Sequence, residues 1–168
     1  MTEKHDNDPS PVDVRTAVNR KSDRELIVTR TFHAPARIVF QAWSRPELFQ
    51  RWWIPKATGM TIVGCEMDVR TGGSYRLEIT PPGSDQPMAF YGKYLEVVPD
   101  ARIVWTNEEE DGGAVTTVTF EEKNGTTQLT LTERYSTSQA LEDALEGSAT
   151  ALPEQFAQLD ELLGAHAP

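Results

Sequence analysis

The last stretch of the chain, residues 137–163, constrains the fold most, because its apolar residues recur every three or four positions. That spacing is the period of one face of an amphipathic helix. The apolar face consists of Leu141, Leu145, Ala149, Leu152, Phe156, Leu159 and Leu163. Ser136 and Gln139 have the spacing of a capping box and predict where the helix begins. Pro153 lies inside the pattern and predicts a kink or break near Thr150.

The residues before this helix predict a long sheet. A first strand at residues 25–32 is followed by a helix that Pro35 opens and by a short second helix that ends at Pro55. From Gly59 onward the pattern changes to the alternation of half-buried strands. These strands are predicted at residues 60–69, 75–79, 88–98, 102–107, 115–122 and 129–135.

Short turns between these strands, such as Asn124-Gly125, predict antiparallel pairing. The long helix then has to cover one face of the resulting sheet. The predicted fold class is α+β, with a strongly curved antiparallel sheet of about six to seven strands wrapped around the C-terminal helix. Two short helices follow the first strand.

The composition bounds the class of protein and its organisation. Residues 1–23 are polar, contain Pro9 and Pro11, and are predicted to be a disordered leader. Residues 24–164 are predicted to form a single domain, and residues 165–168 a short tail. A net charge of −10 disfavours nucleic acids and anionic membranes as partners. Cys65 is the only cysteine, and no apolar run has the length of a signal peptide or membrane span, so we expect a cytoplasmic protein.

A set of motifs carries a family resemblance. In chain order they are Arg30-Thr31-Phe32-His33-Ala34-Pro35, Val39-Phe40-Gln41-Ala42-Trp43, Pro46-Glu47-Leu48, Trp52-Trp53-Ile54-Pro55, Arg70-Thr71-Gly72-Gly73-Ser74-Tyr75, Gly92-Lys93-Tyr94-Leu95-Glu96-Val97-Val98-Pro99, Thr117-Val118-Thr119-Phe120 and Gly125-Thr126-Thr127. Together they resemble the START-like (SRPBCC, helix-grip) superfamily. Within it, the chain resembles the family named after the activator of the heat shock protein 90 ATPase, related to polyketide-cyclase-like proteins.

The resemblance implies a helix-grip fold with a deep apolar cavity between the curved sheet and the long helix. It does not imply one chemistry, because members of the superfamily include lipid and polyketide binders, cyclases, toxin-sequestering proteins and chaperone co-factors. A shared fold alone therefore does not assign a function.

Residues for metal or nucleophilic chemistry are sparse. The histidines at positions 5, 33 and 166 lack ligand spacing, and Cys65 has no Cys or His neighbour, so no metal site is expected. The G-x-S-x-G elbow, the P-loop and the dinucleotide-binding pattern do not occur in the sequence. We expect no cofactor, and this lack of recognisable machinery favours a non-catalytic role.

The aromatic residues are the stronger signal. Pockets for small apolar ligands combine aromatic walls with a few polar groups that fix orientation. Trp43 and Phe120 are assigned to the core. The candidate ligand-binding residues are Trp52, Trp53, Tyr75, Phe90, Tyr94, Trp105 and Phe156.

The ionisable residues on the predicted strands are the alternative source of chemistry. They are Glu66, Asp68, Arg70, Arg76, Glu78, Glu133 and Arg134. Their alternation with apolar neighbours predicts that they face solvent. A carboxylate that faced inward would have a raised pKa and could act as a general acid or base.

Three functional hypotheses follow, in order of preference. The first is binding of a hydrophobic or aromatic small molecule in the cavity between the sheet and the C-terminal helix. The second is a cyclase-like or hydrolytic enzyme that uses Glu66, Glu78 or Glu133 as an inward carboxylate beside a tyrosine or arginine. The third, suggested by the resemblance alone, is a protein that acts on a chaperone. An exposed edge strand leaves a monomer and a homodimer both open.

Overall fold

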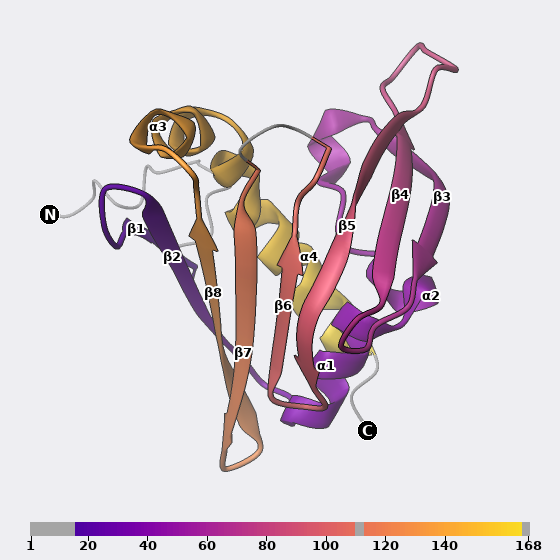
Figure 1. Cartoon of the computed structure of the whole chain (residues 1–168). Helices are drawn as coiled ribbons and strands as arrows, with labels where there is room; N and C mark the ends of the chain where they lie inside the picture. The colour runs from indigo at the N-terminus through magenta and orange to yellow at the C-terminus, as the bar shows by residue number, and fades with distance from the viewer. Residues whose placement is uncertain (1–15, 110–112, 166–168) are drawn as a thin grey trace, which may run out of the picture.

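The computed structural model describes residues 16–109 and 113–165. Its centre is one antiparallel eight-stranded sheet in the order β1-β2-β8-β7-β6-β5-β4-β3 (Figure 1). The strands are β1 (Ala17–Arg20), β2 (Glu25–Phe32), β3 (Thr61–Met67), β4 (Ser74–Thr80), β5 (Met88–Val98), β6 (Arg102–Thr106), β7 (Val115–Lys123) and β8 (Thr126–Arg134).

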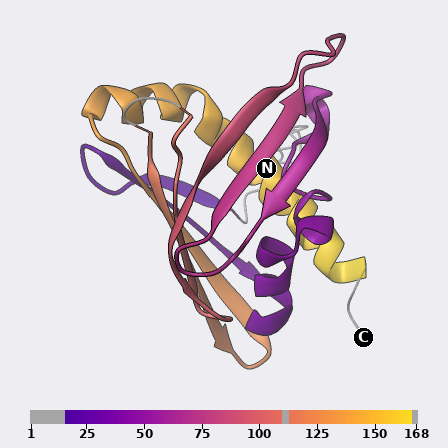
Figure 2. The ribbon, with the colours of Figure 1, turned by 45° about the vertical axis from the view of Figure 1, so that its right-hand side comes forward.

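Helices cover the inner side of this sheet. Helix α1 (Ala36–Ser44), helix α2 (Pro46–Phe49) and the 3-10 turn η2 (Lys56–Thr58) follow β2. Helix α3 (Ser138–Glu146), the 3-10 turn η3 (Ser148–Ala151) and helix α4 (Leu152–Ala165) follow β8. The turned view in Figure 2 shows these last segments running diagonally along the inner side of the curved sheet. The predicted α+β helix-grip class is thereby confirmed.

The long helix is interrupted between Gly147 and Ala151, in the region where a kink or break was expected. Pro153 lies in the first turn of α4, where its missing N–H has no partner to lose. One detail of the prediction was wrong. The N-cap of α3 is Thr137 rather than Ser136, and its side chain accepts a hydrogen bond from the N–H of Ala140 at 3.0 Å.

The strand count was also too low, because the sheet has an additional edge strand. Strand β1 lies inside the segment predicted to be a disordered leader and pairs antiparallel with β2, with Val18 opposite Val28. The rest of that predicted leader, residues 1–15, lies outside the described residues.

Strand register places two rows of side chains side by side on the inner face. One row runs across four strands and is wholly apolar: Val28, Leu131, Val118 and Ile103. The neighbouring row runs Leu26, Glu133, Thr116, Trp105 and Tyr94. The second row therefore carries polar groups into the interior between an aliphatic end and an aromatic end.

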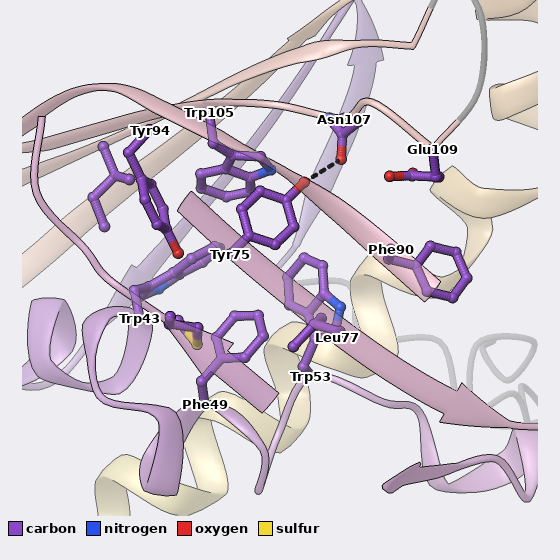
Figure 3. A pocket seen from close by; sticks show the side chains of 12 residues that line it. Trp43, Phe49, Trp53, Tyr75, Leu77, Phe90, Tyr94, Trp105, Asn107 and Glu109 are labelled. Carbon is purple, nitrogen blue, oxygen red and sulfur yellow. Dashed lines mark hydrogen bonds between the residues drawn. The ribbon is translucent and has the colours of Figure 1, made fainter. Parts of the chain in front are cut away.

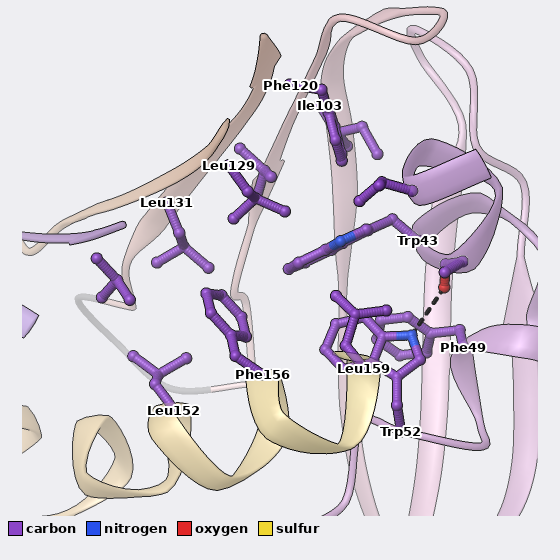
Figure 4. Packing of buried hydrophobic residues seen from close by; sticks show 14 of the residues in the cluster. Trp43, Phe49, Trp52, Ile103, Phe120, Leu129, Leu131, Leu152, Phe156 and Leu159 are labelled. Carbon is purple, nitrogen blue, oxygen red and sulfur yellow. Dashed lines mark hydrogen bonds between the residues drawn. The ribbon is translucent and has the colours of Figure 1, made fainter. Parts of the chain in front are cut away.

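Helix α4 closes the β2–β8–β7 side of the inner face. Phe156 and Leu159 are fully buried, and Phe156 points toward Leu131 while Leu159 lies on the side of Trp52 (Figure 4). Arg30 points inward from β2, where its guanidinium forms a salt bridge of 3.1 Å with Asp160 of α4. None of the helices in the described ranges is long and apolar enough to cross a membrane.

Candidate ligand-binding site

An aromatic pocket lies on the other side of the inner face, between strands β3 to β6 and the α1–α2 segment (Figure 3). Its volume is about 90 Å³. The lining residues are Trp43, Phe49, Trp53, Met67, Tyr75, Leu77, Phe90, Tyr94, Ile103, Trp105, Asn107 and Glu109. No described residue of α3, η3 or α4 lines it, so the predicted position beneath the terminal helix was wrong.

The deep wall of the pocket is made of buried side chains. The Trp43 ring lies 5.9 Å from the Trp105 ring, and Tyr94 stands opposite Trp105 in the β5–β6 register. The Trp43 indole N–H has no hydrogen-bond partner among the described residues. Burial raises the pKa of the Tyr94 hydroxyl above its ordinary value, so this group stays protonated at neutral pH.

The outer rim of the pocket is polar and only half-buried. It is formed by Tyr75, Asn107 and Glu109, with Phe90 beside them. The Tyr75 hydroxyl donates to the Thr106 carbonyl at 2.6 Å. Burial, and then the nearby charge of Glu109, raise the pKa of Tyr75. Because these residues are partly exposed while the deep wall is buried, this end is the mouth of the pocket.

Close approach of two strands sets the position of this rim. A Cβ added at Gly92 of β5 would lie 1.9 Å from the carbonyl oxygen of Thr106. Only glycine can therefore bring β5 so close to the residue that holds the Tyr75 hydroxyl.

Helix α4 holds one wall of the pocket although it does not line it. The Gln158 side chain donates to the carbonyls of Trp52 and Ile54, each at 2.9 Å, and accepts from the N–H of Lys56 at 2.9 Å. Gln155 reaches the Trp53 carbonyl in the same segment. These bonds fix the backbone from which the Trp53 ring enters the pocket.

The structure divides the predicted ligand-binding residues into two groups. The pocket brings together Trp53, Tyr75, Phe90, Tyr94 and Trp105.

Trp52 and Phe156 do not line this pocket. Both side chains are 0 % exposed and lie in the core, and the Trp52 indole N–H donates a hydrogen bond to the Ala42 carbonyl at 2.9 Å. The side chains of adjacent residues in a short turn point in different directions. The local sequence does not determine which of the two tryptophans packs in the core and which faces the pocket.

Sequence reasoning missed other lining residues. Trp43 was assigned to the core, yet it is both buried and part of the pocket wall. Asn107 and Ile103 lie at positions that continue the inward parity of Trp105, so strand alternation could have found both. Glu109 follows the end of β6, and no periodic signal in the sequence points to it.

The strand carboxylates also divide. Glu66 is exposed, and Glu78 pairs with Arg76 at 3.2 Å on the outer face, so neither is an inward carboxylate. Glu133 differs, because it shares the inward parity of Leu129 and Leu131. The expectation that it faces solvent was therefore wrong.

Glu133 is enclosed by two hydroxyl groups. The Tyr135 hydroxyl donates to it at 2.6 Å, and the Thr116 hydroxyl at 3.4 Å. Burial raises the pKa of Glu133, while these two hydrogen bonds act in the opposite direction. Glu133 does not line the pocket, but Thr116 and Asn107 connect it to the rim.

Other chemistry has little support in the described residues. They contain no group of three or more potential metal ligands. Cys65 is half-buried on β3, and burial raises its pKa to about 11. Its thiol is therefore poorly ionised at neutral pH, as in an unreactive structural cysteine.

The fold and the pocket together define a helix-grip protein with an aromatic hollow. The chain belongs to the Activator of Hsp90 ATPase homolog 1-like protein family, whose model matches residues 33–164. This confirms the resemblance seen in the sequence motifs. No curated protein matches the chain at a significant level.

Solved structures show the same fold. Protein CV1439 from Chromobacterium violaceum is 29% identical, with 82% of this chain and 96% of that chain covered and a TM-score of 0.70. Protein Ms6760 from Mycobacterium smegmatis is 25% identical, with 94% and 100% covered and a TM-score of 0.76. Protein NE0264 from Nitrosomonas europaea is 22% identical, with 87% and 97% covered and a TM-score of 0.78. Family membership is consistent with small-molecule binding in general and assigns no substrate or reaction.

Proposed function

We propose that this protein binds a small aromatic or otherwise apolar molecule in the pocket between β3–β6 and the α1–α2 segment. The observation that carries the proposal is the wall of rings from Trp43, Trp53, Tyr75, Tyr94 and Trp105 around an unfilled volume. Burial of the ligand's apolar surface against these rings supplies the binding free energy, at about 25 cal/mol per Å² before association costs.

The volume limits the ligand to at most one ring. A cavity of about 150 Å³ can hold benzene, and this pocket offers about 90 Å³, so even a single ring has to extend in part through the mouth beside Phe90 and Glu109. Long fatty chains and fused polyketide rings therefore fit less well than single-ring compounds.

Ligand-observed NMR with single-ring compounds and with dodecanoate as a fatty-chain comparison tests the proposal. Leu77→Phe places a larger side chain in the buried wall of the pocket and reduces the space for a ligand. It is expected to weaken single-ring binding at least about tenfold, because a mismatch of even one methylene group in an apolar pocket has an effect of this size. The matched control is Val63→Phe on β3, where the side chain is 55% exposed and outside the pocket. Absence of any binding, or equal binding by both folded variants, would contradict the proposal.

A second candidate, the cyclase-like or hydrolytic enzyme, is favoured by the inward carboxyl of Glu133 beside Tyr135. A buried acid with a raised pKa is a suitable general acid. The candidate ranks below binding because Glu133 reaches the pocket only through Thr116 and Asn107. The third hypothesis, action on a chaperone, stays a prediction of the family resemblance.

A further inference from the structure

The pocket mouth carries a one-sided hydrogen-bonding pattern. Its three polar residues are Tyr75, Asn107 and Glu109. Tyr75 and Asn107 can each offer a hydrogen-bond donor or an acceptor, whereas the Glu109 carboxylate offers acceptors alone. The hydrogen bonds that each one already makes decide which of these remain for a ligand.

The orientation of the Asn107 amide is fixed from behind. Its nitrogen donates to the Ala114 carbonyl at 2.9 Å and to the Thr116 hydroxyl at 3.1 Å. A carbonyl oxygen can only accept, so the nitrogen and not the oxygen of the amide must face Ala114. Both N–H groups are therefore used, and the amide oxygen faces the Tyr75 side of the pocket (Figure 3).

Glu133 supports this orientation. The Thr116 hydroxyl donates to the Glu133 carboxyl at 3.4 Å, which leaves the Thr116 oxygen to accept from Asn107. Glu133 thus acts through Thr116 as a positioning residue for the amide at the mouth.

The Tyr75 hydroxyl, like the Asn107 amide, uses its donor within the protein. Its one proton goes to the Thr106 carbonyl at 2.6 Å, and the 3.4 Å separation from the Asn107 amide oxygen is much longer. The raised pKa of this group keeps the proton in place at neutral pH. What Tyr75 and Asn107 present to a ligand is oxygen lone pairs.

Charge acts in the same direction. Glu109 is the only charged residue of the pocket lining within the described part of the chain. One of its carboxylate oxygens accepts from the Tyr91 N–H at 3.1 Å, and a carboxylate has further acceptor capacity. Arg76, a nearby cation, is paired with Glu78 and lies against the Tyr91 ring, outside the lining.

We infer that the pocket is specific for a single-ring ligand that carries a hydrogen-bond donor, such as a phenolic hydroxyl or an amine, and that it discriminates against carboxylates. The ring lies among the aromatic walls, and the donor meets the Tyr75, Asn107 and Glu109 oxygens at the mouth. This inference rests on the proposed function, since it names the ligand class of the same pocket.

Four probes of similar size separate the features of the ligand. Phenol and fluorobenzene differ in the donor, and benzylamine and benzoate differ in the sign of charge. We expect phenol to bind about tenfold tighter than fluorobenzene, the effect of one hydrogen bond. We expect benzylamine to bind at least about tenfold tighter than benzoate, because Glu109 attracts one and repels the other. Dissociation constants come from ligand-observed NMR titrations of the full chain.

Two variants test the residues. Glu109→Gln keeps the side-chain size and removes the charge, so the preference for benzylamine over benzoate should fall about tenfold. Asn107→Leu removes one of the acceptor oxygens at the mouth and should reduce the preference for phenol over fluorobenzene. Asn107→Leu also removes the side-chain donors to the Ala114 carbonyl and the Thr116 hydroxyl, although the backbone N–H of residue 107 still donates to Ala114. Its amide NMR spectrum is therefore recorded to establish that it folds, and Glu109→Gln gives an independent answer.

The outcomes distinguish the two proposals. If none of the four probes binds, the proposed function fails. If fluorobenzene binds as tightly as phenol, or benzoate as tightly as benzylamine, the pocket is a receptor but the inferred specificity is overturned. Equal binding of benzoate and benzylamine would instead indicate that a hydrogen-bond acceptor of the ligand meets the indole N–H of Trp43 at the deep wall.

Discussion

The two halves of the inner face are built on the same sheet yet differ in how well they are filled. The sealed half, formed by β2, β7 and β8, packs branched aliphatic side chains against α4, as Leu131 does against Phe156. The hollow half, formed by β3 to β6, faces flat rings from α1, α2 and the Trp53 segment. Interdigitating methyl groups leave little space, whereas rigid rings such as Tyr75 and Tyr94, tilted by 53°, leave a gap.

The terminal helix and the pocket therefore have separate roles. Helix α4 seals one half and fixes the fold, and through Gln158 it holds the wall of the other half without entering it. Substitutions in the two halves should therefore affect different properties: stability in the sealed half and ligand binding in the hollow half.

The largest expected effect comes from truncating the centre of the sealed half. Phe156→Ala should lower the free energy of unfolding by about 3–5 kcal/mol, because the residue is fully buried and leaves a cavity. Phe90→Ala at the half-buried pocket mouth should cost only about 1 kcal/mol, because less packing is lost. Urea unfolding of both variants measures the difference. Equal costs would show that the two halves are filled alike.

A smaller effect is expected from the link between the halves. Gln158→Leu leaves the carbonyls of Trp52 and Ile54 without this donor. Buried unpaired groups cost about 1–3 kcal/mol, and the freed Trp53 ring should also weaken ligand binding. The matched control is Gln139→Leu on α3, because Gln139 is exposed and its side chain donates to Asp143 of the same helix at 3.0 Å. A destabilised Gln158→Leu protein with unchanged ligand affinity would separate the helix from the pocket entirely.

The sealed half could be predicted from the sequence more fully than the hollow half. Alternation and turn signals located β2 at its observed bounds, Glu25–Phe32, and the helical period identified Phe156 and Leu159 as an apolar face. These properties depend on residues close together in the chain. Strand alternation also indicated that Glu133 faces inward, because it lies two and four residues after Leu131 and Leu129. Its acidic side chain nevertheless favoured the opposite prediction, that it faces solvent.

The pocket depends on contacts that local sequence does not contain. Whether Trp52 or Trp53 faces the hollow is set by a bond from Trp52 to Ala42 and by Gln158, more than 100 residues further on. The orientation of Asn107 is set by the Ala114 carbonyl across a loop. The motifs therefore predicted that an aromatic site exists, but not which rings form it or where it lies relative to the terminal helix.

The smallest expected effect concerns Glu133, at the boundary between the halves. Burial raises its pKa in the folded protein above the ordinary value of 4.5. The folded state then holds a proton that the unfolded chain has released, so wild-type stability falls as the pH rises from about 4.5 to the raised pKa. Glu133→Gln does not titrate, and its stability relative to wild type should increase across that window and stay constant above it.

Each unit by which the pKa is raised contributes about 1.4 kcal/mol to this increase. Urea unfolding between about pH 4 and pH 9 measures the two profiles. Glu121→Gln, on the exposed end of β7, is the control and should follow the wild-type profile. Parallel profiles for wild type and Glu133→Gln would mean that water reaches the Glu133 carboxyl. In that case the boundary row of Glu133, Thr116 and Trp105 would belong to the hollow half, and the pocket would extend further under the sheet than its aromatic lining indicates.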